Sequence, residues 1–188
     1  FAGTVHEPAL SLAEMLLRTV GNPRLKKVFY TDNGSTGMEV AIKMGLRAAC
    51  ARYGWSPQES IKILGLKGSY HGDTIGAMDC SEPSTFNKKV EWYRGRGYWF
   101  DFPQVGMKDG VWQVRFPEEL QEELGSDIRF ESLDAVFDLH ARRESDVAKG
   151  YRTYIKRTLE DLVHRQGVKF GALIMEPVIL GAGGMLFA

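Results

Sequence analysis

The sequence predicts an α/β fold: a three-layer sandwich built on a mostly parallel sheet. Three observations support this class. Short apolar, β-prone runs alternate with longer segments of helical periodicity, polar turns rich in glycine follow the apolar runs, and no internal repeat or low-complexity linker interrupts the order. With 188 residues, the chain is long enough to bury a good core and is close to the usual size of one domain.

Apolar residues recur at a spacing of three to four in three segments, which predicts a helix in each. On the second of these helices, Glu39 and Lys43 stand four residues apart and are expected to form an ion pair on the side opposite the apolar face. The three expected helices cover residues 8–20, 38–54 and 144–164.

Three short apolar runs predict strands, at residues 27–31, 61–66 and 170–175. Strands that alternate with helices favour parallel pairing, because a crossover helix returns the chain to the same end of the sheet. Residues 81–117 have no sustained period and are rich in aromatic residues and glycine. We expect this stretch to form a long, packed excursion, since loops of this length are usually functional or inserted.

Composition excludes several classes of function. Lys and Arg together number 24, as do Asp and Glu, so the formal net charge is zero and nothing predicts nucleic acid or an anionic membrane as a partner. No apolar run has the length of a membrane span, and the start does not resemble a signal peptide. Cys50 and Cys80 form no framework, and the four histidines are scattered singly, so no metal site is expected. Free thiols suit a reducing, intracellular compartment.

The strongest local signal is the string Asp32-Asn33-Gly34-Ser35-Thr36-Gly37 between an expected strand and a helix. A helix N-terminus offers unpaired N–H groups and a partial positive charge, while glycine permits close approach and the two hydroxyls add donors. Gly34, Ser35 and Thr36 thus predict a phosphate-binding turn. Alternatively, Asn33, Ser35 or Thr36 simply caps the helix. The string is neither a GxGxxG fingerprint nor a P-loop.

A second polar string, Ser69-Tyr70-His71-Gly72-Asp73, follows the expected strand 61–66. Ligands of open parallel sheets gather at the carboxyl ends of the strands, where Tyr70 could stack on a flat heterocycle and Gly72 would leave room for it. The alternative is structural: a packed tyrosine and a hydrogen-bonded core histidine.

The third signal is Glu176, which ends the expected strand 170–175 and precedes Pro177. A carboxylate in this position either faces the ligand crevice or caps a neighbouring loop. The glycine-rich stretch 181–184 that follows allows a close backbone approach, or forms an ordinary turn.

Together these strings resemble the class III (fold-type I) aminotransferases, which depend on pyridoxal 5′-phosphate (PLP). Within that class the chain is most similar to the diaminopelargonate (DAPA) aminotransferases of biotin biosynthesis. The resemblance covers residues 1 to about 80 and about 168 to 188, and residues between them look like the longer middle region of eukaryotic forms, which are commonly fused to dethiobiotin synthetase. The strings that carry it are residues 29–36, 68–74, 76–78, 174–177 and 181–185, with residues 4–9 near the start.

The resemblance implies that residues 1–188 are part of the PLP-binding large domain, with an extended middle region at about 81–165. It assigns substrate contacts to Tyr70 and Asp73, the latter near the substrate's amino group. No catalytic residue is expected in this segment, because the Schiff-base lysine and the aspartate facing the ring nitrogen would lie beyond Ala188. The segment alone should therefore be inactive. The implied cofactor-binding residues are Gly34, Ser35, Thr36, Tyr70, His71 and Glu176.

The implied reaction converts 7-keto-8-aminopelargonate to 7,8-diaminopelargonate, with S-adenosylmethionine as amino donor. A homodimer with shared active sites is implied, with a mitochondrial location in a eukaryote and a cytoplasmic one otherwise. Both ends look cut, so the sequence is expected to be an interior segment of a longer protein. Two alternatives stay open: another class III enzyme of the ω-amino-acid or ornithine type, and a non-covalent α/β module that binds a phosphate ligand.

Overall fold

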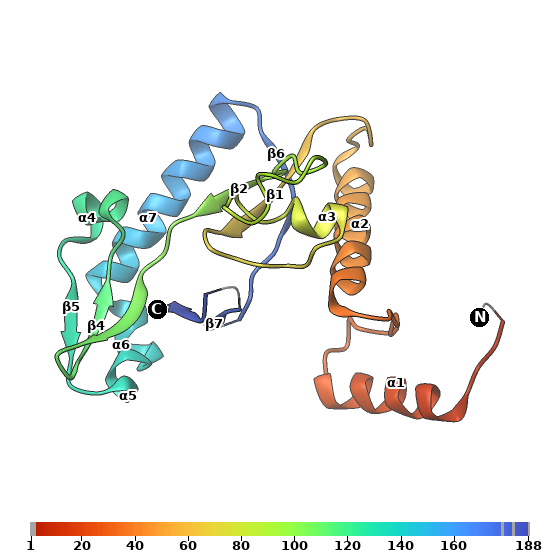
Figure 1. The fold of residues 1–188 in the computed structure, drawn as a ribbon, viewed down its shortest axis with the longest axis horizontal. Helices are drawn as coiled ribbons and strands as arrows, with labels where there is room; N and C mark the ends of the chain where they lie inside the picture. The colour runs from red at the N-terminus through yellow and green to blue at the C-terminus, as the bar shows by residue number, and fades with distance from the viewer. Residues whose placement is uncertain (1–2, 178, 182, 188) are drawn as a thin grey trace. The chain divides into compact units, whose positions relative to one another are not determined.

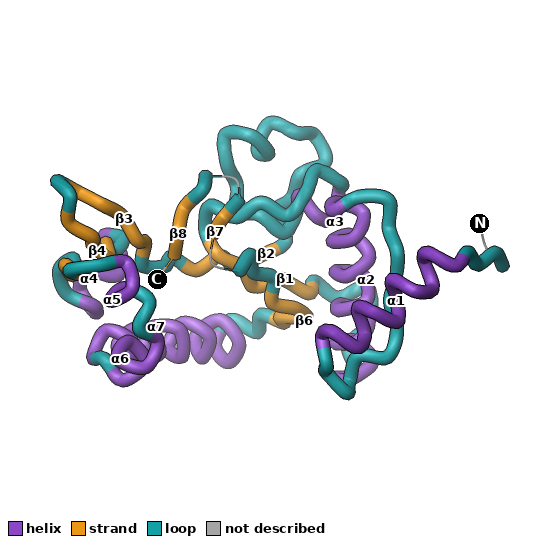
Figure 2. Tube along the Cα trace, turned by 90° about the horizontal axis from the view of Figure 1, so that it is seen from below, coloured by secondary structure: helices purple, strands orange, loops and turns teal. Residues whose placement is uncertain are grey.

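The computed structural model describes residues 3–177, 179–181 and 183–187 (Figures 1 and 2). The chain divides into two compact units, Phe1–Asn33 and Gly34–Ala188. No helix within the described residues combines the length and apolar character needed to cross a bilayer.

The first unit contains one helix, α1 (Glu7–Val20), which confirms the helix expected at 8–20. The His6 side chain accepts a hydrogen bond from the Ala9 N–H at its start, and Gly21 ends it in the left-handed conformation. The prediction of a strand at 27–31 is wrong, because this segment is a loop, as Figure 2 shows. A strand exists only when a neighbouring strand satisfies its backbone groups, and among the described residues this segment pairs with none.

A parallel sheet is the centre of the second unit. Its three strands lie in the order β2-β1-β6, and both neighbouring pairs are parallel. The strands β1 and β6 confirm two of the expected strands, whereas β2 lies in the segment where the sequence predicted no element. The bounds are β1 (Ile61–Leu66), β2 (Gly97–Phe100) and β6 (Lys169–Leu173).

Helices cover both faces of this sheet, which confirms the three layers (Figure 1). Successive side chains of a strand point to opposite faces, so Ile63 packs on the side of α2 (Gly34–Tyr53) and Leu66 on the side of α7 (Asp146–Glu160). The short helix α3 (Ile75–Met78) contacts α2. Helix α7 continues into a π-helical turn, η1 (Asp161–Arg165), and the two match the third expected helix.

A second, antiparallel sheet occupies much of the middle region, in the order β5-β4-β3-β8-β7. It was not anticipated, because its strands are only two to five residues long. Its buried core includes Val114, Leu120 and Val136. The strands are β3 (Gln104–Lys108), β4 (Val111–Arg115), β5 (Ile128–Phe130), β7 (Ile179–Leu180) and β8 (Met185–Phe187), with helices α4 (Glu118–Leu124), α5 (Leu133–Val136) and α6 (Leu139–Glu144) nearby.

Candidate functional site

The carboxyl ends of β1 and β6 and the start of α2 bring together the three polar strings found in the sequence. The loop after β1 carries Tyr70, His71 and Asp73, the chain after β6 carries Glu176, and Ser35 lies in the first turn of α2. We call these five residues the carboxyl-end cluster. Ligands in α/β proteins gather at this edge of the sheet.

The loop after β1 lies directly on the first turn of α2. The Ser35 Oγ accepts a hydrogen bond from the Asp73 backbone N–H at 3.1 Å. Gly72 has φ of +126°, and a Cβ built there would lie 2.3 Å from the Ser35 Oγ and 2.9 Å from its Cα. Only glycine allows this approach. Gly34 stands exposed at the start of the same turn, and Thr36 is half-buried in it.

Tyr70 connects the loop to both acidic residues of the cluster. Its hydroxyl donates to the Asp73 Oδ2 at 3.0 Å, and its backbone N–H donates to the Glu176 Oε2 at 3.1 Å. The other oxygen of Glu176 accepts from the Gly181 N–H at 2.7 Å. Glu176 therefore caps two loops at once, as one of the two sequence interpretations stated. Ala182, in the glycine-rich stretch, lies outside the described residues.

Tyr70 is an exposed residue, with 46% of its surface accessible. The hydrogen bond to the Asp73 carboxylate, with slight burial, raises the pKa of Tyr70 above its ordinary value. The hydroxyl therefore stays protonated and serves as a donor.

His71 is buried, with 7% of its surface exposed, and its Nε2 has no hydrogen-bond partner among the described residues. Burial lowers the pKa of His71, and the negative charge of Glu176 opposes this only in part. The ring is therefore a buried, neutral imidazole. The interpretation of His71 as a packed residue fits its burial, but the expected hydrogen bond is missing at Nε2.

Glu39 is a residue of this site that sequence reasoning missed. Instead of forming a close pair with Lys43, its Oε2 accepts from the Thr74 hydroxyl at 2.6 Å and from the N–H groups of Gly76 and Ala77 at 2.9 and 3.0 Å. Burial opposes ionisation, but these bonds, with the more distant charge of Lys43, hold the pKa of Glu39 below its ordinary value. The carboxylate fastens α2 to the start of α3.

Neither Lys67 nor Cys80 supplies a free amine or a thiolate near this edge. Lys67 follows β1 directly, but its Nζ contacts the carboxylates of Asp101 and, at 3.0 Å, Glu119. Burial opposes the charge, yet these two carboxylates raise the pKa of Lys67. Burial likewise raises the pKa of the Cys80 thiol to about 12. Among the described residues, no group of His, Cys, Asp and Glu could hold a metal ion.

A cavity of about 620 Å³ opens beside the carboxyl-end cluster. Its lining includes Tyr70, Gly72 and Asp73 from the loop after β1, and Glu82 and Phe86 from the chain after α3. The sequence did not predict Glu82 and Phe86 as site residues, because they lie in the segment without periodicity.

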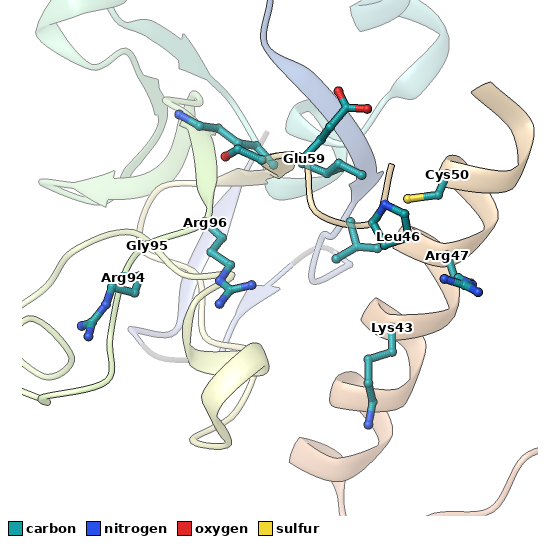
Figure 3. Close-up of a pocket in the computed structure, with 12 residues that line it drawn as sticks. Lys43, Leu46, Arg47, Cys50, Glu59, Arg94, Gly95 and Arg96 are labelled. Carbon is teal, nitrogen blue, oxygen red and sulfur yellow. The ribbon is translucent and has the colours of Figure 1, made fainter. Parts of the chain in front are cut away.

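A second cavity, of about 480 Å³, lies near the amino ends of the same strands. Figure 3 shows Lys43 and Arg47 on α2 and Arg94 and Arg96 on the segment before β2. Their cationic groups point in different directions and do not converge on one position. Arg96 pairs with the buried carboxylate of Asp79 at 2.9 Å.

Curated relatives resemble the whole of this chain. It is 71% identical over 188 residues to the bifunctional dethiobiotin synthetase/adenosylmethionine-8-amino-7-oxononanoate aminotransferase of Emericella nidulans, covering 100% of this chain and 24% of the relative. It is 40% identical over 194 residues to the mitochondrial bifunctional dethiobiotin synthetase/7,8-diamino-pelargonic acid aminotransferase of Arabidopsis thaliana, covering 98% and 23%. The chain thus spans about a quarter of the length of these relatives.

Solved structures agree on the fold. An amine transaminase from an uncultivated Pseudomonas species, in its PLP-bound form, superposes with a TM-score of 0.59 at 21% identity, over 99% of this chain and 34% of that one. The family model described as aminotransferase class-III matches residues 1–122. The chain therefore belongs to the class III aminotransferases, which use PLP.

Proposed function

We propose that the protein containing this chain transfers an amino group to 7-keto-8-aminopelargonate (8-amino-7-oxononanoate) and forms 7,8-diaminopelargonate in biotin biosynthesis. The observation that carries the proposal is the joining of Ser35, Tyr70, Asp73 and Glu176 by hydrogen bonds at the carboxyl edge of the sheet, in a class III aminotransferase. The names of the fungal and plant relatives support this substrate, and that of the fungal relative supports S-adenosylmethionine as amino donor.

The residues present fit PLP. The loop at Gly72 lies against the turn that begins α2, so the exposed ring of Tyr70 stands close to that turn, where N–H groups favour an anion. PLP, when bound, supplies an electron sink for carbanion chemistry. In the proposed assignment, Gly34, Ser35 and Thr36 hold the phosphate, and Tyr70 borders the ring.

The remaining members of the cluster support that arrangement. Glu176 accepts a hydrogen bond from the backbone N–H of Tyr70, and His71 is buried in the same loop as a neutral ring. Asp73, held by Ser35 and Tyr70, would face the amino group of the substrate.

The wider organisation follows from the same proposal. We place residues 1–188 in the PLP-binding large domain, with the middle region at about 81–165 as an elaboration of it. A homodimer with shared active sites and a fusion to dethiobiotin synthetase are proposed, the latter because both relatives carry it in their names. An intracellular, mitochondrial location is proposed on the printed name of the Arabidopsis relative.

The activity is tested on the full-length protein. Purified enzyme with PLP is given 8-amino-7-oxononanoate and S-adenosylmethionine, and diaminopelargonate is measured by mass spectrometry. We expect turnover that depends on both substrates. An enzyme that instead aminates other keto acids from ω-amino-acid or ornithine donors, and forms no diaminopelargonate, would contradict the proposal.

The phosphate-binding turn is tested separately in the same protein. Ser35→Ala should weaken PLP retention by roughly 1.5–3 kcal/mol, the worth of one hydrogen bond to a charged group. Ser60→Ala, an exposed residue at the opposite edge of the sheet, is the control and should retain PLP fully. Equal PLP affinity in both variants would remove Ser35 from the site.

A further inference from the structure

We propose that the cavity beside Tyr70 recognises a cationic amino donor and that Glu82 is a specificity-determining residue for it. This inference rests on the proposed function and goes beyond it, because it names the charge that the pocket selects and the side chain that selects it.

The first observation is charge. Asp73 and Glu82 both line the cavity, and no lysine, arginine or histidine lines it among the described residues. Neither carboxylate forms an ion pair within the described chain: Asp73 accepts from the neutral Tyr70 hydroxyl, and Glu82 accepts from the Gly68 N–H at 2.6 Å. Lys67, next to Gly68, is already neutralised by Asp101 and Glu119. The described residues that line the cavity therefore carry a net negative charge, which favours a cation.

The second observation is the aromatic surface of the cavity. Phe86 is 88% exposed and Tyr70 is 46% exposed, although large aromatic rings usually bury most of their area. Aromatic faces attract cations, and quaternary ammonium ligands are bound in this way by aromatic cages; a sulfonium is an onium cation of the same kind. Met78 and Met185 extend this apolar wall.

The third observation is unused hydrogen-bonding capacity in the wall. Ser69 and Ser81 line the cavity, are more than nine-tenths buried, and have hydroxyls without a partner among the described residues. Buried hydroxyls are normally paired, so these two are available to a bound polar group after a small side-chain rotation.

These properties distinguish the two substrates of the proposed reaction. S-adenosylmethionine carries a sulfonium and an ammonium against one carboxylate, so its net charge is positive. The amino-keto acid carries one ammonium against one carboxylate and is net neutral, so two carboxylates in the cavity attract it less than they attract the donor. The cavity therefore fits the donor better than the acceptor.

The experiment measures binding and turnover in the full-length protein with PLP. Glu82→Gln removes the charge but keeps an oxygen that can accept from the Gly68 N–H, so the loop should stay in place. We expect the KM and the calorimetric Kd for S-adenosylmethionine to rise roughly tenfold, with kcat and the KM for the amino-keto acid nearly unchanged. Glu122→Gln, an exposed acid on α4 outside the cavity, is the matched control and should change neither constant.

A neutral analogue separates charge recognition from shape. S-adenosylhomocysteine lacks the sulfonium charge, so the wild type should bind S-adenosylmethionine more tightly than this analogue, and Glu82→Gln should reduce that preference. An unchanged preference and an unchanged Kd in Glu82→Gln would overturn the inference. If the proposed function fails, the wild type forms no diaminopelargonate. The Kd values for S-adenosylmethionine and S-adenosylhomocysteine still test the role of Glu82 in that case.

Discussion

The two ends of the parallel sheet have cavities of similar volume but differ in the arrangement of their polar side chains. The cavities measure about 620 Å³ at the carboxyl end and about 480 Å³ at the amino end. At the carboxyl end, Ser35, Tyr70 and Glu176 bind backbone or side-chain groups of other segments. At the amino end, the cations diverge, as Figure 3 shows. The amino end also has ion pairs between segments, Lys169 with Glu59 and Arg96 with Asp79, so the carboxyl end is distinguished by three polar strings that are joined at one place and not by cavity size.

The direction of α2 explains the difference. The helix begins at Gly34, beside the carboxyl ends of the strands, while Lys43 and Arg47 lie farther along it, in the cavity at the amino ends. The partial positive charge of its N-terminus is thus delivered to the carboxyl edge, where the glycine-containing loops can approach it.

The largest effect is expected from Gly72→Ala, which should disrupt the carboxyl edge. The new Cβ would meet the Ser35 Oγ at 2.3 Å, at a φ of +126° that L residues rarely adopt. We expect the free energy of unfolding to fall by roughly 3 kcal/mol and the affinity for PLP to fall with it. Denaturant melts and PLP titrations of the full-length protein measure both.

Gly54→Ala is the control that measures the effect of backbone strain without a steric clash. Gly54 also has a positive φ, of +67°, but nothing lies within 4 Å of its Cβ position, so only backbone strain is added and PLP should stay bound. Equal PLP loss in both variants would mean that the close packing of Gly72 on Ser35 is irrelevant to the site.

A smaller effect is expected from comparing two positions on the same helix. Glu39→Ala removes the acceptor of three hydrogen bonds and should cost roughly 1–3 kcal/mol of stability, because the N–H groups of Gly76 and Ala77 lose their partner. Arg47→Ala, near the other end of the sheet, should change stability by no more than about 0.5 kcal/mol. Chemical denaturation measures both, and similar losses would erase the contrast between the two edges.

The smallest effect concerns pH. Because burial lowers the pKa of His71, the unfolded chain binds a proton more readily than the folded one below the ordinary value of 6.5. The stabilising contribution of neutral His71 is therefore complete above that pH and is lost as the pH falls toward the lowered pKa. Melting temperatures between pH 8 and pH 5 should fall more steeply in the wild type than in His71→Gln; parallel curves would contradict this.

The sequence by itself determined the local elements and the residues that carry chemistry. Periodicity located α1, α7 and the strands β1 and β6, and the strings at Ser35, Tyr70 and Glu176 indicated the site. These signals are short-range: each depends on neighbours within a few residues, which is the range over which propensity and capping act.

The tertiary structure decided what depends on distant partners. The segment at 27–31 has strand-like residues but no strand beside it, whereas β2 forms because β1 offers it a parallel edge. Glu39 binds Thr74 across 35 residues of sequence, and Glu82 and Asp73 line the same cavity. Hydrogen-bond partners and shared cavities depend on how separate segments pack in three dimensions, so no local sequence pattern predicts them.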